Sequence, residues 1–284
     1  MGNISKVCAT SYSTTIEFPH VIKRNDPKVS SGSTVRIASS LLLVASCALF
    51  SFCAFGQVNV WTQHNDNGRT GANTAETQLN TFNVNAFQFG KLFQYAIDAP
   101  VFAQPLVISN VSIPGKGVRD VVFAVTMNNS VYAFDADDAT KDSGQPIWFV
   151  NFNNPSAGIS PVPSTDITSS TAYVGPYGIM GTPVIDQATG TMYLVVRTKE
   201  SGAYFQRLRA LDITTGQERS GSGVSISASV TNSGGTTVFS PKMENQRPAL
   251  ALANGRVYIS WASHADVVPL ARPFGHTASG PNLV

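Results

Sequence analysis

The chain has 284 residues, a formal net charge of +2 and a charged fraction of 13%, well below the quarter usual in soluble domains. Asn, Ser, Thr and Gly take the place of the missing charges, a mixture that favours short strands joined by many turns. All three cysteines lie within the first 56 residues, which excludes a disulfide framework, a thiolate metal site or a cysteine nucleophile from the remainder; they are Cys8, Cys47 and Cys53.

The first 56 residues predict an export signal. Basic residues precede an uncharged apolar run over 37–55, and Ala54 and Gly56 place small side chains before Gln57. This order is typical of a secretory signal cleaved near Gly56 and Gln57. The basic residues are Lys23, Arg24, Lys28 and Arg36.

Two alternatives to cleavage remain for this segment. Residues 37–56 are long enough to act as an uncleaved membrane anchor with its basic side inside. The sequence before Cys47 also looks like a lipobox, although the apolar run continues well past that cysteine. The predicted location is exported, either periplasmic or secreted, with membrane anchoring by residues 37–56 as the alternative.

Export would remove the basic excess. Five of the 19 Lys and Arg residues and two of the 17 Asp and Glu residues precede residue 57, which leaves 14 basic and 15 acidic residues and a net charge of −1. This balance argues against a nucleic-acid partner.

One phrase recurs three times after residue 57. Each copy contains two short apolar runs, and the first two copies end on an Asp that follows two apolar residues. Recurrence of this kind indicates stacked units of one architecture. The copies cover residues 104–135, 181–212 and 247–260.

The repeats predict short strands. The apolar runs are rich in β-branched and aromatic residues and are bounded by turn formers, which favours buried strands over helices. Asn254 and Gly255 predict a type I′ hairpin between two of them. A further strand, 91–97, leads the series. The other predicted strands are 101–108, 120–126, 130–135 and 146–152, then 180–186, 191–197, 205–212 and 223–230, then 248–253 and 256–261.

Four-stranded units that repeat in this way predict an all-β fold, a β-propeller of antiparallel blades. The propeller is incomplete, with about two and a half blades and a leading strand that would close the ring with a last blade. The predicted organisation is a signal or anchor region over 1–56, a partial propeller over 57–263 and an irregular tail over 264–284. A frameshift or truncation of a longer propeller near residue 265 is one interpretation of the tail, and a genuine short tail is the other.

The repeats resemble the pyrroloquinoline-quinone-type, or quinoprotein-like, β-propeller repeats. The family phrase is roughly Val-Tyr-Ala-Leu-Asp-x-x-Thr-Gly-x-x-x-Trp, and residues 131–135, 144–148 and 210–216 are similar to it. Ser220 stands at the position of the family's Trp in the second copy. Residues 61–73 also look like the segment that leads into the first blade of such proteins.

The repeat positions have structural interpretations without the family. Tyrosines would fill the space between blades, and aspartates at strand ends would accept hydrogen bonds from the following turn. Glycines would supply positive φ, and Trp148 would pack onto the next blade. These structural repeat residues are Tyr132, Asp135, Gly144, Trp148, Tyr193, Asp212, Gly216 and Tyr258.

The resemblance implies a quinone cofactor, Ca²⁺ and a catalytic aspartate only for the enzymes of the family. Such enzymes hold the quinone beneath a disulfide of adjacent cysteines, and the chain beyond residue 56 has no cysteine. We therefore predict no cofactor. Only the family resemblance suggests quinone and Ca²⁺ as cofactors.

Two charged groups and one long loop are further candidate sites. An acidic cluster lies after the first repeat phrase, and its spacing lacks the features of an EF-hand, so a solvated loop is the simpler interpretation. Four basic residues alternate along two adjacent strands and are expected to share one face if those strands pair. The Pro-, Ser- and Gly-rich loop 153–181 is expected to overhang a mouth of the propeller. The acidic residues are Asp135, Asp137, Asp138 and Asp142, and the basic ones are Arg197, Lys199, Arg207 and Arg209.

No familiar catalytic constellation is present. The histidines after residue 57 lack zinc-site spacing, and no Gly-x-Ser-x-Gly motif occurs. We predict an exported binding or scaffold protein with no catalytic site, whose partner is an unknown protein or a cell-envelope polymer. The alternatives are the N-terminal part of a quinoprotein-like oxidoreductase with its active site in further blades, and a non-functional product. Open sheet edges also predict self-association.

Overall fold

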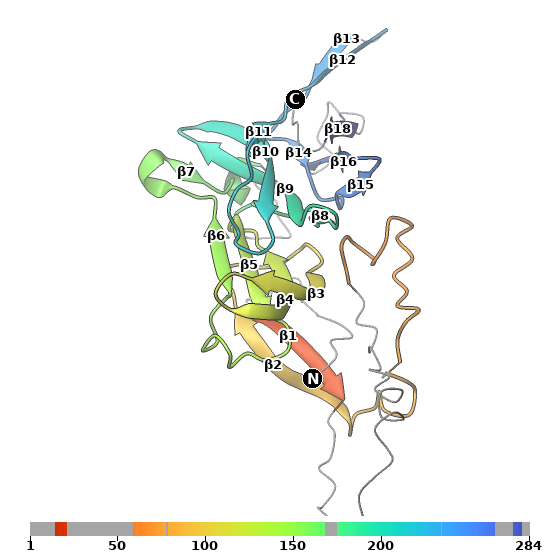
Figure 1. The fold of residues 1–284 in the computed structure, drawn as a ribbon. Helices are drawn as coiled ribbons and strands as arrows, with labels where there is room; N and C mark the ends of the chain where they lie inside the picture. The colour runs from red at the N-terminus through yellow and green to blue at the C-terminus, as the bar shows by residue number, and fades with distance from the viewer. Residues whose placement is uncertain are drawn as a thin grey trace, which may run out of the picture.

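The computed structural model describes residues 15–21, 59–77, 79–167, 175–233, 235–264 and 275–279. Over these residues the chain is all-β, with several antiparallel sheets of which none is closed (Figure 1). The predicted all-β class is therefore confirmed.

The first repeat forms one four-stranded antiparallel sheet in chain order. Its strands are β3 (Leu106–Ile113), β4 (Gly117–Val125), β5 (Ser130–Asp135) and β6 (Trp148–Asn151). All four predicted strands are present, although β3 begins later than expected and runs further toward its turn.

The second repeat forms a similar sheet with one added strand. The series β8 (Val184–Asp186), β9 (Thr191–Glu200), β10 (Ala203–Asp212) and β11 (Val224–Ser225) pairs in chain order. The short strand β7 (Ile159–Ser160) also pairs with the far end of β9, so the loop before β8 is itself attached to the sheet. That loop contains the 3₁₀ turns η1 (Pro155–Ala157) and η2 (Ser164–Asp166).

The third repeat contributes β15 (Ala251–Ala253) and β16 (Arg256–Ser260). The turn between them has φ of 51° at Asn254 and 69° at Gly255, as the type I′ prediction requires. β18 (Gly275–Ser279) pairs with β16, so the tail predicted to be irregular supplies a strand.

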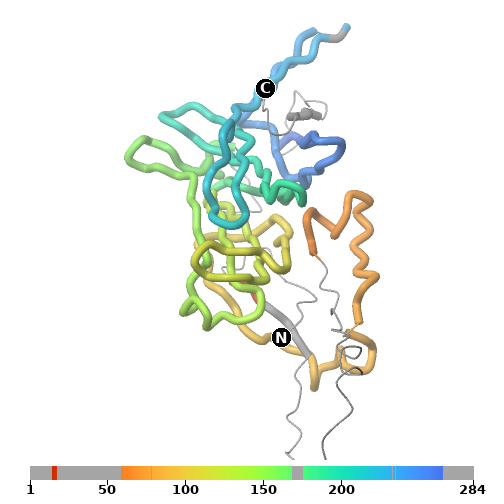
Figure 2. Tube along the Cα trace, viewed as in Figure 1, coloured from red at the N-terminus to blue at the C-terminus, as the bar shows by residue number. Residues whose placement is uncertain are grey.

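Smaller pairs of strands accompany the third sheet. β14 (Glu244–Asn245) pairs with β17 (Ala262–Ser263). β12 (Ser229–Asn232) and β13 (Gly235–Val238) form a hairpin that extends away from the rest of the chain (Figure 2).

The predicted leading strand is β2 (Phe89–Ala96), and it pairs with β1 (Thr15–Val21). β1 lies within the segment predicted to be an export signal, and Ile16 on it is fully buried. The apolar run 37–55 lies outside the described residues.

Consecutive sheets share hydrophobic cores. In β4, Val121 and Phe123 face the second sheet, whereas Val122 faces the β1–β2 pair. In β9, Leu194 faces the first sheet and Tyr193 faces the third. Each central strand is therefore buried on both faces, which explains its unbroken apolar sequence.

The lead-in segment 59–73 contacts the first strand of each of the first two repeat sheets and the residue before the first strand of the third. The Val60 N–H donates to the Val107 carbonyl at 2.7 Å, and the Trp61 carbonyl accepts from the Ile185 N–H at 2.9 Å. Further along, the Arg69 guanidinium donates to the Leu250 carbonyl at 2.9 Å. This one segment is therefore hydrogen-bonded to all three repeats.

Candidate functional site

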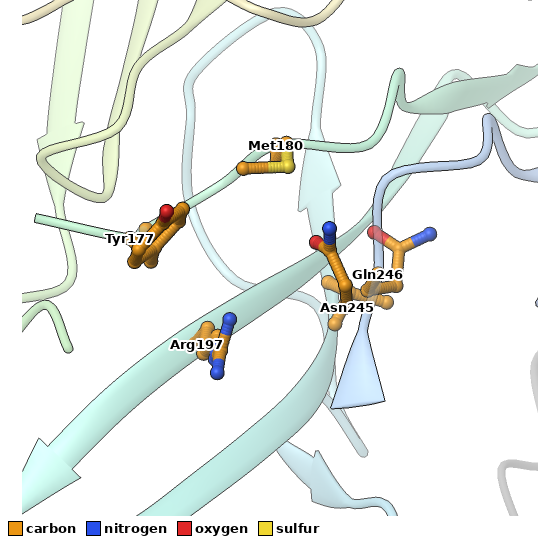
Figure 3. Close-up of a pocket in the computed structure, with 7 residues that line it drawn as sticks. Tyr177, Met180, Arg197, Asn245 and Gln246 are labelled. Carbon is orange, nitrogen blue, oxygen red and sulfur yellow. The ribbon is translucent and has the colours of Figure 1, made fainter. Parts of the chain in front are cut away.

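A small pocket, open to solvent, lies where the second sheet, its long loop and β14 meet. Its cavity volume is about 10 Å³, room for about one water molecule. Figure 3 shows Tyr177 and Met180 on one side, Asn245 and Gln246 on the other, and Arg197 on β9. The lining residues are Tyr177, Gly178, Met180, Val195, Arg197, Asn245 and Gln246.

Backbone contacts fix the loop side of the pocket. Tyr177 and Val162 pair across the loop, with the Tyr177 N–H donating to the Val162 carbonyl at 2.7 Å. Gly178 lies so close to the Met127 carbonyl that a Cβ would overlap it, so only glycine fits there. The predicted loop 153–181 is therefore anchored at its end rather than free.

The opposite wall is attached to the second sheet by one buried glutamine. Gln206 lies across from Arg197 in the β9–β10 register. Its amide donates to the Glu244 carbonyl at 2.7 Å, and its carbonyl accepts from the Trp261 indole at 2.7 Å. These bonds set the position of β14, and hence of Asn245 and Gln246, against β9.

Arg197 is the principal charged group of the pocket and is only 4% exposed. One of its terminal nitrogens contacts His264 Nε2 and the other donates to the Lys242 carbonyl, while its Nε–H has no partner. Among the described residues no carboxylate forms an ion pair with it. Burial lowers the pKa of Arg197 to about 10, so the group stays cationic at neutral pH.

His264 supports this arginine as a neutral acceptor. Arginine has only donors, so Nε2 of His264 accepts and its proton lies on Nδ1. Burial and then the Arg197 charge lower the pKa of His264 to about 3. The imidazole also packs edge-on against Tyr177, with ring centroids 4.8 Å apart.

Gln246 completes the polar wall. Its amide donates to the Pro248 carbonyl at 2.7 Å, whereas its buried Oε1 has no partner. Gly181 has no side chain to block the close approach of this glutamine. The pocket therefore combines an unpaired buried cation with an unsatisfied amide, an arrangement suited to binding a polar group.

The other predicted basic residues lie elsewhere and have acidic partners. Lys199 pairs with Asp166 at 2.7 Å, Arg207 pairs with Glu200, and Arg209 pairs with Glu218 at 2.9 Å. The prediction of one shared face is wrong.

The register explains this error. Arg197 lies opposite Gln206, and Arg207 lies opposite Val196. Directly opposite residues share a face, so Arg197 and Lys199 lie on one face of the sheet and Arg207 and Arg209 on the other.

Residues of the acidic cluster form ion pairs and hydrogen bonds with nearby residues. Asp135 is 1% exposed, pairs with Lys141 at 3.1 Å and accepts from the Asp137 N–H at 2.9 Å. Asp142 pairs with Lys116 at 2.6 Å. Over the described part of the chain, no group of three His, Cys, Asp or Glu residues is arranged to hold a metal ion.

Two of the three repeat tyrosines lie between sheets. Tyr132 belongs to the core shared by β2 and the first sheet, where burial and then the Asp98 charge raise its pKa to about 12. Tyr193 belongs to the core between the second and third sheets. Tyr258 is 39% exposed, and no sheet of the described residues covers that face, so its position between blades stays a prediction.

The remaining repeat residues join the first two sheets. Trp148 donates its indole N–H to the Ile213 carbonyl at 2.9 Å and lies against Gly216. Gly144 and Gly216 have the expected positive φ of 77° and 73°. Asp212 accepts from the Thr214 N–H at 2.8 Å, the bond expected for an aspartate that ends a strand.

Sequence reasoning found Arg197 and the loop but not the residues that join them. Gln206, Gln246 and His264 are isolated polar residues in the sequence, and only the packing of the third repeat on the second brings them to Arg197. A single glutamine within the apolar alternation of β10 was the available signal. His64 is exposed, and the side chain of His276 lies outside the described residues.

No protein-family model matches the chain, and no curated protein matches its sequence. None of the helices within the described ranges is long and apolar enough to span a membrane.

Proposed function

We propose that the chain is an exported, bacterial-type β-propeller protein of the quinoprotein-like repeat class that binds a cell-envelope polymer at the Arg197 pocket. Its role is binding or scaffolding rather than catalysis. The location, the propeller and the family are parts of this proposal.

The observation that carries it is the burial of β4 and β9 on both faces. Successive four-stranded sheets that share cores on each side are the local arrangement of neighbouring propeller blades. A rigid scaffold of this kind presents its loops at one end, and the 153–181 loop forms part of the pocket wall. The pocket is small and is lined by both polar and apolar side chains, which suits one group of a polymer better than a broad protein interface.

Co-sedimentation tests the proposal. The full chain is incubated with insoluble peptidoglycan sacculi, and the bound fraction is compared with that of the Tyr177→Ala variant, which removes one pocket wall. We expect the wild-type protein to sediment and the variant to bind less. Equal sedimentation of both proteins, or none of either, would contradict binding at this pocket.

A titration with pyrroloquinoline quinone and Ca²⁺ tests the enzyme alternative. We expect neither a saturable absorbance change nor redox turnover with an alcohol and an artificial electron acceptor. Saturable binding with turnover would favour the quinoprotein-like oxidoreductase instead.

A further inference from the structure

We propose that the Arg197 pocket is a carboxylate-binding site. This inference rests on the proposed binding function and names the chemical class of the group that is bound. The same chemistry can come from a free small carboxylate or from a carboxylate carried on a polymer, and the test below separates the two.

The positive charge of Arg197 has no anionic partner among the described residues. Arg197 is buried, lines the pocket and makes two hydrogen bonds to neutral acceptors only, which are His264 and the Lys242 carbonyl. A buried cation without an anionic partner is costly, and a ligand anion would remove that cost. Its Nε–H is buried and has no hydrogen-bond partner, so it remains a donor without an acceptor.

The planar guanidinium of Arg197 has the shape to bind a carboxylate. A guanidinium offers its N–H groups in one plane, and a carboxylate matches that geometry with two oxygens. The Arg197 guanidinium lies 5.7 Å from the centroid of the Tyr177 ring, so an aromatic face borders its charge. Asn245 and Gln246 bring amide groups to the opposite side.

The pocket has too little positive charge for a more highly charged anion. Lys199 is the cation nearest along β9, but it donates to Asp166 Oδ2 at 2.7 Å, and the same oxygen accepts from the Tyr204 hydroxyl at 2.9 Å. Lys242 lies over the Tyr204 ring, 5.2 Å from its centroid. Among the described residues that line the pocket, Arg197 is the only cation, which suits a monoanion better than phosphate.

The test is a titration of the full chain with sodium acetate, with a short poly-L-glutamate and with sodium chloride at matched ionic strength. The readouts are the ¹⁵N resonance of the Arg197 Nε–H and the melting temperature, because a ligand that binds only the folded state raises the latter. We expect acetate and polyglutamate, but not chloride, to shift the resonance and raise the melting temperature.

Three variants make the result specific. Arg197→Lys keeps a cation but lacks the planar fork, and we expect its affinity for carboxylate to fall by about tenfold or more. Lys199→Met removes one positive charge from the same face outside the pocket, and we expect it to bind as the wild type does. Because Arg197→Lys can also weaken folding, Asn245→Ala serves as a second pocket variant, and we expect it too to bind more weakly.

The outcomes are distinct. Tighter binding of polyglutamate per carboxylate would identify a polymer as the source, and equal binding of acetate would identify a free carboxylate. No resonance shift with either probe, or equal shifts with chloride, would overturn the inference. Sacculus binding without carboxylate binding would overturn this inference alone, whereas carboxylate binding without sacculus binding would overturn only the polymer partner.

Discussion

Two residues have pKa values that are shifted because the folded protein disfavours their charged forms, and each shift can be measured through the pH dependence of stability. Asp137 lies near Asp120 and Asp135, and burial followed by these like charges raises its pKa to about 6. His264 is held neutral beside Arg197, with its pKa lowered to about 3. The two residues therefore give stability opposite dependences on pH.

Asp137→Asn is expected to stabilise the protein near neutral pH by about 1 kcal/mol, after allowance for partial solvent screening. A raised carboxyl pKa means that stability is full below pH 3.8 and is lost as pH rises through about 6, so the gain should vanish below about pH 4. Denaturant unfolding at pH 4 and pH 7.5 measures it. Asp138→Asn is the matched control, because Asp138 accepts hydrogen bonds from Thr140 and its loss should not stabilise.

His264→Gln is expected to flatten the acid side of the stability profile. A lowered histidine pKa means that its contribution is full above pH 6.5 and is lost as pH falls toward about 3. The wild type should lose up to about 1.4 kcal/mol per pH unit more than the variant within this window. Parallel slopes for the two proteins would show that His264 does not remain neutral.

At the scale of elements, the contact between the first two sheets depends on the absence of one side chain. Gly216 has positive φ, and a Cβ there would lie 2.6 Å from the Trp148 ring. Trp148, the first residue of β6, therefore packs directly on the turn from Asp212 to Gly216.

Gly216→Ala should destabilise the protein by about 2–4 kcal/mol, because it adds a steric overlap to the cost of positive φ. Gly144→Ala isolates the second effect, since φ there is 77° and nothing lies within 4 Å of the added carbon. We expect it to cost only about 1 kcal/mol. Equal losses in thermal unfolding would argue against the Trp148 contact.

Much of this element-level structure is predictable from sequence, because β-branched runs and turn residues specify strands locally. The type I′ turn at Asn254 and the strands of the first two repeats follow from such signals. The facing of Arg197 depends on the register of the β9–β10 hairpin, because a single residue of register reverses a side chain. The two-residue turn of Ser201 and Gly202, both at positive φ, sets that register, and the prediction of one shared face did not take it into account. The convergence of His264 and Gln246 depends on contacts between repeats, which no single-strand pattern encodes.

At the scale of the whole molecule, the lead-in segment joins repeats that are distant in sequence. Arg69 donates to Thr62 at 2.6 Å, to the Gln63 carbonyl at 2.8 Å and to the Leu250 carbonyl at 2.9 Å. It therefore links its own segment to the third sheet.

Arg69→Ala should destabilise the protein by about 2 kcal/mol through loss of charge-assisted hydrogen bonds. The loss should be concentrated in the third sheet, which native-state hydrogen exchange can localise. Arg247→Ala, at an exposed arginine in the same region, is the matched control and should have little effect.

The central claim is that successive repeats pack as sheets sharing cores on both faces. Native-state hydrogen exchange of the full chain tests this claim most directly. We predict that the amides of β4, β5, β9 and β10 are the most protected and exchange together, because the core between the first two sheets cannot open on one side alone. Rapid exchange of β9 while β4 stays protected would contradict the account.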